Sequence, residues 1–315
     1  MDEIQNKLWA VGGGKGGCGK SIVTLMLGAS LAKLGMKIVL IDADLGGSNL
    51  HILAGIRYPT CTLADFIGRR VETLEEVAMD TPIRNMKIIC GADDILGVAN
   101  PKYSQKTRLF NHIRKLDADM ILLDLGAGTS FTAIDFFNYA GNKIVVLTPQ
   151  MTSLQNAYGF IKSSLYRALN EAFRKEPQIL DLIGRAALSV QGENIDSIAR
   201  LYDEIGRFGA EHQKVLKDCL RDMKIGVIVN MVRERKERNV SNIIRSVARN
   251  YLSLDLEELG IVNYENILNA SINDMAEYLI GGKDTAARGD FYDIAYRIVK
   301  NSRTIRPVFP APLFT

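Results

Sequence analysis

The most constraining feature of the chain is a glycine-rich segment between an apolar run and a helical pattern. Residues 14–21 read Gly-Lys-Gly-Gly-Cys-Gly-Lys-Ser. The apolar run 8–11 precedes them, and residues 21–34 have the spacing of a helix that ends at Gly35. A glycine-rich turn from a buried strand into a helix is the pattern of a phosphate-binding loop. The pattern therefore predicts a strand, a loop and a helix in that order.

This loop supplies the groups that nucleotide phosphates require. Its glycines let successive backbone N–H groups point at phosphate oxygens, and the positive end of the following helix adds to the attraction. In this arrangement Lys20 neutralises the β- and γ-phosphates, and the Ser21 hydroxyl binds Mg²⁺. The predicted phosphate-binding residues are Gly14, Lys15, Gly16, Gly17, Cys18, Gly19, Lys20 and Ser21.

Further apolar runs predict a parallel sheet. They cover residues 37–41, 120–124, 143–148, 224–230 and 259–262, with a weaker candidate at 86–90. The runs are continuous rather than alternating, which indicates that both faces of each strand are buried. Helical segments lie between them. We therefore expect a doubly wound α/β fold, in which helices flank a mostly parallel sheet.

The composition excludes several classes of protein. The 315 residues are 47% hydrophobic with a net charge of +3, which suits a large folded domain rather than disorder or general nucleic-acid binding. No apolar run reaches the roughly 18 to 20 residues that span a bilayer, and the N-terminus lacks a signal peptide's apolar stretch. We expect a cytoplasmic protein, at most peripheral at the inner face of the cell membrane. The cysteines form no CxxC pair, which argues against structural zinc or a disulfide framework: Cys18, Cys61, Cys90 and Cys219.

One connection is longer than a single crossover helix requires. Residues 149–223 predict a helix over 154–173, an interruption at Pro177 and a second long helix over 194–223. The second helix has apolar positions at alternating spacings of three and four, from Ile195 to Met223. Two interpretations remain open. This segment is either a helical hairpin that packs on itself and on the sheet, or an arm that docks a partner or supports a dimer.

Carboxylates follow two of the predicted strands. Asp42 and Asp44 come directly after the strand 37–41, and Asp124 ends the strand 120–124. Ligands of parallel sheets bind at this carboxyl edge. Hydrolysis of a nucleotide needs an acceptor for the proton of water and ligands for Mg²⁺, and these carboxylates suit both roles. The alternative for Asp42 and Asp44 is that they cap the loop.

The second lysine of the loop identifies a family. Lys15 lies five residues before Lys20, and this pair resembles the deviant Walker A signature of the MinD/ParA superfamily. In that family the early lysine reaches across a nucleotide-sandwich homodimer to the partner's phosphates. The resemblance implies that ATP binding forms the dimer and that hydrolysis releases it.

The same resemblance implies roles for the carboxylates. Residues 42–50 resemble the family's switch I, in which Asp44 orients the attacking water and Asp42 lies near the magnesium shell. Residues 124–128 resemble Walker B joined to switch II, in which Asp124 holds Mg²⁺ or its water. The backbone N–H of Gly128 then senses the γ-phosphate.

The base is predicted to be adenine. In the family, an asparagine at the position of Asn230 reads the adenine edge, although capping of the following helix is an alternative. The NKxD motif of guanine-binding GTPases is absent, because residues 142–145 read Asn-Lys-Ile-Val. We therefore expect ATP and Mg²⁺ as cofactors.

Three stretches, 124–130, 148–158 and 251–260, most resemble the FlhG/FleN branch, which sets flagellar number and placement. The chain departs from this branch at Gln150-Met151, where Glu-Pro is usual, and starts almost at its first strand. We expect one P-loop ATPase domain, 1–302, with a helical insertion at about 165–223 and a proline-rich tail, 303–315. The implied function is a slow, partner-stimulated ATPase that positions or counts a cellular structure. Alternatives are a nucleotide-regulated scaffold with negligible turnover, a DNA-partitioning ATPase, and a metabolic ligase or synthase.

Two segments are candidates for contact with larger partners. Residues 290–306 predict an amphipathic helix with basic residues near its end, which either lies on a membrane or packs on the sheet. Residues 233–238, with Arg245 and Arg249, form the densest basic segment. Its interleaved glutamates favour a solvated helix face over DNA binding. A protein effector is also expected.

These assignments separate binding from hydrolysis. Lys20→Ala should abolish ATP binding, with a loss of about 100-fold or more in affinity, because a phosphate charge loses its cation. Asp44→Ala is the matched control and should bind ATP normally, as measured by isothermal titration calorimetry. Equal affinities of the two variants would contradict the assignment of Lys20.

Overall fold

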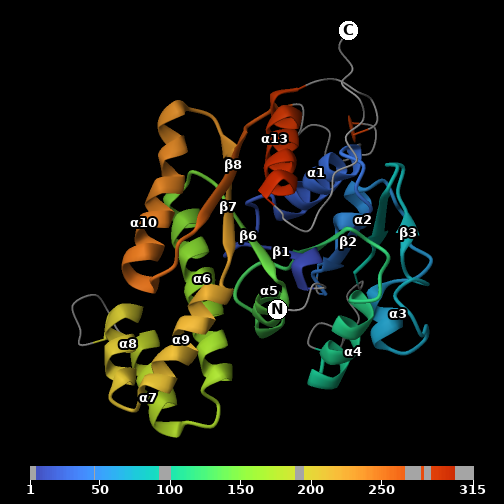
Figure 1. The fold of residues 1–315 in the computed structure, drawn as a ribbon. Helices are drawn as coiled ribbons and strands as arrows, with labels where there is room; N and C mark the ends of the chain where they lie inside the picture. Colours follow the sequence, from blue (N-terminus) through green and yellow to red (C-terminus); the bar gives the residue numbers. More distant parts are fainter. Residues whose placement is uncertain are drawn as a thin grey trace.

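An eight-stranded sheet forms the centre of the structure, a computed structural model (Figure 1). The structure describes residues 5–45, 47–91, 101–188, 195–266, 278–279 and 285–301. The predicted tail 303–315 lies outside these residues, as do Gly46 of the switch I segment and Asn194, the predicted start of the second long helix.

The strands confirm the predicted doubly wound α/β fold. They are β1 (Leu8–Gly12), β2 (Ile38–Ala43), β3 (Met79–Asp80), β4 (Met86–Ile89), β5 (Met120–Leu125), β6 (Asn142–Leu147), β7 (Ile225–Val232) and β8 (Glu257–Asn263). Their order is β3-β4-β2-β5-β1-β6-β7-β8, and only the pairing of β3 with β4 is antiparallel among these strands. The weaker candidate at 86–90 is β4. The short edge strand β3 was not predicted.

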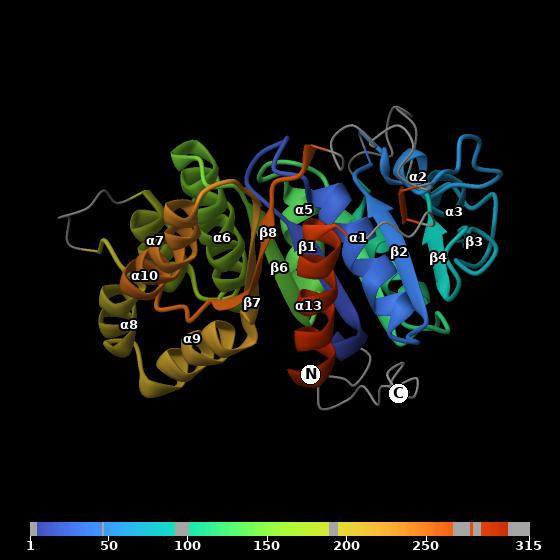
Figure 2. The same cartoon turned by 90° about the horizontal axis from the view of Figure 1, so that it is seen from above.

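Helices cover both faces of this sheet (Figure 2). The core on one face is formed with α1 (Lys20–Lys33), α2 (Leu50–Leu53) and α13 (Ala286–Asn301). The other core is formed with α3 (Leu63–Ile67), α4 (Tyr103–Ile113), α5 (Phe131–Tyr139), α6 (Met151–Ala172) and α10 (Val240–Leu252). Two 3₁₀ turns, η1 (Gln5–Lys7) and η2 (Arg235–Asn239), complete these elements. All residues of β2 and β5 are buried, because alternate side chains enter the two cores.

The long connection forms three helices after α6, and the prediction of one helix over 194–223 is wrong. The helices are α7 (Pro177–Leu188), α8 (Ile198–Gly206) and α9 (Ala210–Asp222). The chain turns at Gly209, whose φ of 137° is a conformation that favours glycine. The seam residues Ile198, Ile205 and Leu216 are buried as predicted. They pack the helices on one another and on α6 and α10 (Figure 1). This packing agrees with the hairpin interpretation.

Helix α13 closes the β8 edge of the sheet. Its apolar face is buried against α1 and β8: Phe291, Ile294, Ala295, Ile298 and Val299. Asp290 Oδ2 accepts a hydrogen bond from Asn263 N at 2.8 Å. Arg297 donates to Leu259 O at 2.8 Å. The helix therefore satisfies backbone groups that an open edge would expose, and its apolar face is not available to a membrane in this structure. No helix among the described residues is both long and apolar enough to cross a bilayer.

The burial of this face has a measurable consequence. Phe291→Ala should lower the free energy of unfolding by about 3–5 kcal/mol, because the residue is fully buried. The matched control Tyr292→Ala changes a neighbour that is 45% exposed and should cost less than about 1 kcal/mol. Urea denaturation followed by circular dichroism measures both. Similar small effects of the two variants would mean that this face is not packed.

Candidate nucleotide-binding site

The glycine-rich loop joins β1 to α1 in a conformation that depends on its glycines. Gly17 has a φ of 84° and Gly19 a φ of 86°, both in the left-handed region. A Cβ on Gly13 would lie 2.8 Å from the carbonyl oxygen of Val146. A Cβ on Gly14 would overlap the backbone of Asn156 in α6. The loop therefore packs tightly on the end of β6 and on α6.

The two lysines of the loop lie in different environments. Lys20 is only 8% exposed, and its Nζ lies 3.4 Å from the carbonyl oxygen of Lys15. The Cys18 thiol donates to the same oxygen at 3.4 Å. The side chain of Lys15 is exposed. The loop thus directs one lysine inward and leaves the other at the surface.

Two carboxylates are buried side by side where β2 and β5 end. Asp42 and Asp124 are register partners and are 1% and 2% exposed. Thr24 in α1 donates its hydroxyl to Asp124 Oδ1 at 3.2 Å, and the Ser21 hydroxyl lies close enough to lower the pKa of Asp124. Burial and the neighbouring charge of Asp42 raise the pKa of Asp124 to about 7.

This arrangement suits a divalent cation. The hydroxyl of Ser21 and the carboxylate of Asp124 are the hard oxygen donors that Mg²⁺ prefers, and a cation would relieve the repulsion between the buried carboxylates. No three His, Cys, Asp or Glu side chains among the described residues gather to hold a metal by themselves. Oxygens of bound phosphates would complete such a shell. The ligand roles of Ser21, Asp42 and Asp124 stay predictions.

Asp42 also holds its own loop. Its Oδ1 accepts the backbone N–H of Asp44 at 3.1 Å. Its Oδ2 accepts the hydroxyl of Ser48 at 2.7 Å and the N–H of Leu50 at 3.0 Å. These bonds match the alternative interpretation in which Asp42 caps its loop. Burial raises its pKa, and the three donors oppose that shift.

Asp44 lies over the loop that follows β5. A Cβ on Gly126 would come within 2.9 Å of Asp44 Oδ1, so this close approach requires glycine. Gly128 has a φ of 85°, and a Cβ there would meet nothing within 4 Å. The predicted switch segments are therefore in contact. The roles of Asp44 toward water and of Gly128 toward the γ-phosphate stay predictions.

Asn230 holds the phosphate-binding loop. It is 3% exposed, and its Nδ2 donates to the carbonyl oxygen of Cys18 at 3.0 Å. Asn230 lies within β7 and the N-cap of the next element, η2, is Glu234, so the alternative in which Asn230 caps a following helix does not hold. Sequence reasoning did not find the bond to Cys18, because it joins residues 212 positions apart. Recognition of adenine by Asn230 stays a prediction.

A cavity of about 540 Å³ adjoins the loop, a size that suits a nucleotide. Its walls come from the P-loop, the segment after β6, the end of β7 with the segment after it, and the residue after β8. They are Lys15, Gly16, Gly17, Cys18, Thr148, Pro149, Gln150, Thr152, Ser153, Met231, Arg233, Glu237 and Tyr264. The Arg233 guanidinium lies 3.8 Å from the ring centroid of Tyr264, and Glu237 accepts the Arg233 N–H at 2.7 Å. The sequence placed Arg233 only in a basic segment. Its contact with Tyr264 was not predicted, because Tyr264 follows a different strand, β8.

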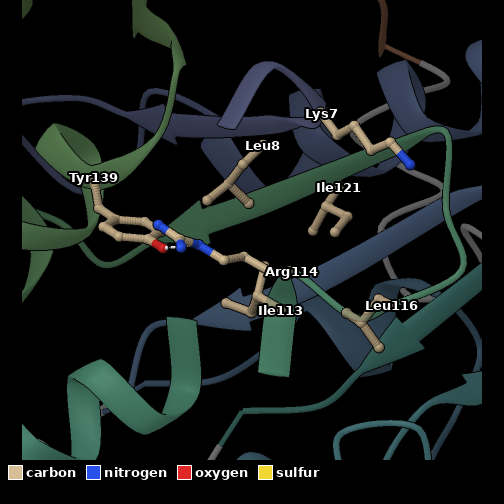
Figure 3. Close-up of a pocket in the computed structure, with 7 residues that line it drawn as sticks. All are labelled: Lys7, Leu8, Ile113, Arg114, Leu116, Ile121 and Tyr139. Atoms are coloured by element: carbon tan, nitrogen blue, oxygen red, sulfur yellow. Dashed lines mark hydrogen bonds between the residues drawn. The ribbon is translucent and has the colours of Figure 1, made fainter. Parts of the chain in front are cut away.

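A second hollow lies among residues at the opposite edge of the sheet, near the start of β1 (Figure 3). Arg114 and Tyr139 point toward one another there, and Arg114 Nε donates to Tyr139 Oη at 2.8 Å. The cavity measures about 10 Å³, which is the space of one water molecule. It is therefore not a site for a nucleotide.

The parallel sheet, the glycine-rich loop and the carboxylates at the strand ends define a P-loop nucleotide-binding protein. The chain belongs to the CobQ/CobB/MinD/ParA nucleotide-binding domain family, whose model matches residues 9–276. This membership confirms the resemblance to MinD/ParA proteins.

Individual relatives agree with this family. The antiactivator FleN of Pseudomonas aeruginosa is 34% identical over 155 residues, which are 49% of this chain and 54% of FleN. The septum site-determining protein MinD of Synechocystis is 31% identical over 48% of this chain and 57% of that protein. The chain thus spans about half the length of the curated relatives it matches.

Solved structures share the fold over most of the chain. MinD of Pyrococcus horikoshii, complexed with Mg-ADP, has a TM-score of 0.60 at 19% identity, and the match covers 93% of this chain and 96% of that one. A ParA family ATPase of Chlorobium tepidum has a TM-score of 0.60 at 13% identity, with 93% and 99% covered. At these identities the likeness shows the fold.

The raised pKa of Asp124 predicts a cost of stability in the nucleotide-free protein. The folded state binds a proton more tightly than the unfolded state, so stability should fall as pH rises from about 4 to about 7. Asp124→Asn removes the buried charge and should raise the free energy of unfolding at pH 8 by about 1–4 kcal/mol.

Urea denaturation of wild type and variant at pH 6 and pH 8 measures this effect, and the difference between them should be smaller at pH 6. Asp117→Asn is the control, because Asp117 lies in an exposed, solvent-screened ion pair with Lys37 whose loss should change stability little. An Asp124→Asn variant less stable than wild type at pH 8 would contradict the prediction.

Proposed function

We propose that the protein is an ATP-dependent dimerising switch that hydrolyses ATP and positions or counts a cellular structure. The exposure of Lys15 carries this proposal. Lys20 is buried beside the phosphate loop, whereas Lys15 is exposed on the wall of the adjoining cavity. A second lysine facing outward from a phosphate loop is suited to phosphates held by another copy of the chain.

Apolar side chains at the same edge support a dimer. The first residues of α4, α5 and α6 are Tyr103, Phe131 and Met151, which are 86%, 69% and 65% exposed. These helices follow β4, β5 and β6, so their first turns lie at the carboxyl edge, where the phosphate loop lies. Exposed aromatic and Met side chains are typical of protein interfaces.

The proposed chemistry uses groups from three strand ends. The P-loop N–H groups and Lys20 bind the phosphates, and bound Mg²⁺ supplies a positive charge beside Ser21 and Asp124. Asp44 accepts a hydrogen bond from the attacking water and orients it. The γ-phosphate contacts the N–H of Gly128, so that its release changes the loop beside Asp44.

The relatives support a role in cellular positioning. FleN is an antiactivator, and the MinD proteins determine septum sites. A chain of the solved MinC:MinD cell division protein complex of Aquifex aeolicus shares this fold, so we include a protein effector in the proposal. Flagella, the division site and chromosomes are the candidate structures.

The basic segment supports DNA binding less well than an internal role. Arg238 bonds to Asn263 Oδ1 at 3.4 Å, Arg245 to the Leu256 carbonyl at 3.0 Å, and Arg249 to Asp255 at 2.7 Å. These guanidinium groups hold loops of the protein itself. The proposal therefore includes neither DNA binding by this segment nor membrane binding by the apolar face of α13.

The proposal predicts an ATP-trapped dimer. Asp44→Ala should retain ATP affinity, lose about 100-fold or more in hydrolysis rate and elute as a dimer in Mg-ATP. Adding Lys15→Ala should return the protein to a monomer, whereas adding Lys300→Ala, a change of an exposed lysine on α13, should not. Size-exclusion chromatography with light scattering measures the mass. A monomeric Asp44→Ala protein in Mg-ATP at micromolar concentration would refute the sandwich dimer.

A further inference from the structure

We infer that Ser48 is a positioning residue for ATP hydrolysis, which holds Asp44 in place through the carboxylate of Asp42. The inference rests on the proposed function, because it assigns to Asp44 the orientation of water. Ser48 has no role in the phosphate loop or in Walker B. Its position follows from the bonds of the segment between β2 and α2.

Asp42 binds both ends of that segment. Its Oδ1 accepts the N–H of Asp44 at 3.1 Å, and its Oδ2 accepts the Ser48 hydroxyl at 2.7 Å and the Leu50 N–H at 3.0 Å. Asp42 is 1% exposed and lies on β2, which pairs with β4 and β5. A rigid, buried carboxylate therefore fixes the start and the end of the segment that carries Asp44.

Of these three hydrogen bonds to Asp42, the one from Ser48 comes from a side chain and the other two come from backbone N–H groups. A hydroxyl bonded to a carboxylate at 2.7 Å is short and charge-assisted, so it is stronger than a bond between neutral groups. Without the hydroxyl, Asp42 Oδ2 keeps only the N–H of Leu50 among these donors. The segment then loses one of three attachments to the sheet.

Residues directly after β4 and β5 are in close contact with the segment between β2 and α2. A Cβ on Gly91, directly after β4, would lie 2.7 Å from Ser48 Oγ and 3.0 Å from the Asp42 carbonyl oxygen. A Cβ on Gly126, after β5, would lie 2.9 Å from Asp44 Oδ1. Glycine at both positions allows this close contact. Ser48 is therefore held against Asp42, and the Asp44 carboxylate against the switch II loop.

Loss of the Ser48 hydroxyl should act on rate and not on binding. A small displacement of a catalytic group lowers the rate strongly, so Ser48→Ala should lower kcat by about 10- to 100-fold. The Kd for ATP should stay within about 3-fold of wild type, because Ser48 bonds to no residue of the phosphate loop. Ser30→Ala is the matched control. Ser30 donates to Met26 O at 2.8 Å inside α1, so this variant also loses a hydroxyl bond but should keep wild-type kcat.

A double-mutant cycle with Asp44→Ala separates positioning from a structural role. If Ser48 acts through Asp44, Ser48→Ala should not lower the residual rate of Asp44→Ala further. A structural defect would lower both rates by the same factor. Equal factors in the two backgrounds, or a wild-type kcat in Ser48→Ala, would overturn the inference.

Amide hydrogen exchange tests the attachment without turnover. In Ser48→Ala the amides of Asp44 and Leu50 should exchange about 10-fold faster or more, while those of α1 stay unchanged. Unchanged exchange at Asp44 and Leu50 would refute the inference alone. Absence of ATP hydrolysis by the wild-type protein would instead refute the proposed function, and with it the catalytic role of Ser48.

Discussion

The burial of two carboxylates side by side is the constraint on which the site depends. Asp42 and Asp124 lie at the ends of adjacent strands, where repulsion and loss of water both oppose their charges. The surrounding groups compensate for this cost in different ways. Hydroxyls of α1 and the charge of Lys20 stabilise the ionised form of Asp124. Hydrogen-bond donors of the loop after β2 stabilise that of Asp42. Under the proposed function, a nucleotide with its cation would complete that compensation and so couple ligand binding to the arrangement of both loops.

Close backbone contacts transmit this arrangement beyond the carboxylates. Gly13 and Gly14 bring the phosphate loop against β6 and α6, and Gly126 brings switch II against Asp44. Because the glycines leave no space at these contacts, a small shift of one loop would displace the next. The exposed starts of α5 and α6, Phe131 and Met151, follow the same loops. In the proposed switch, a change at the γ-phosphate would therefore reach a surface suited to a second copy through few intervening residues.

The sequence predicted most of the fold and the family of the chain. The parallel strands were confirmed because their apolar runs are continuous and because a buried strand shows this pattern locally. The continuous helix over 194–223 was wrong, since the heptad spacing continues across Gly209 although the chain turns there. The amphipathic pattern of residues 290–306 left two interpretations open, contact with a membrane and packing on the sheet. Only the contacts with α1 and β8 distinguish the two.

The sequence by itself determined which residues lie at strand ends and which lysines flank the glycines, because periodicity and spacing are local properties. The tertiary structure decided which of these groups meet. Thr24 reaches Asp124 across 100 residues and Asn230 reaches Cys18 across 212. Strand order sets those contacts, and strand order follows from how the whole sheet buries its two faces. The phosphate loop could therefore be recognised from its sequence, whereas the groups that hold it and its neighbouring carboxylates could not.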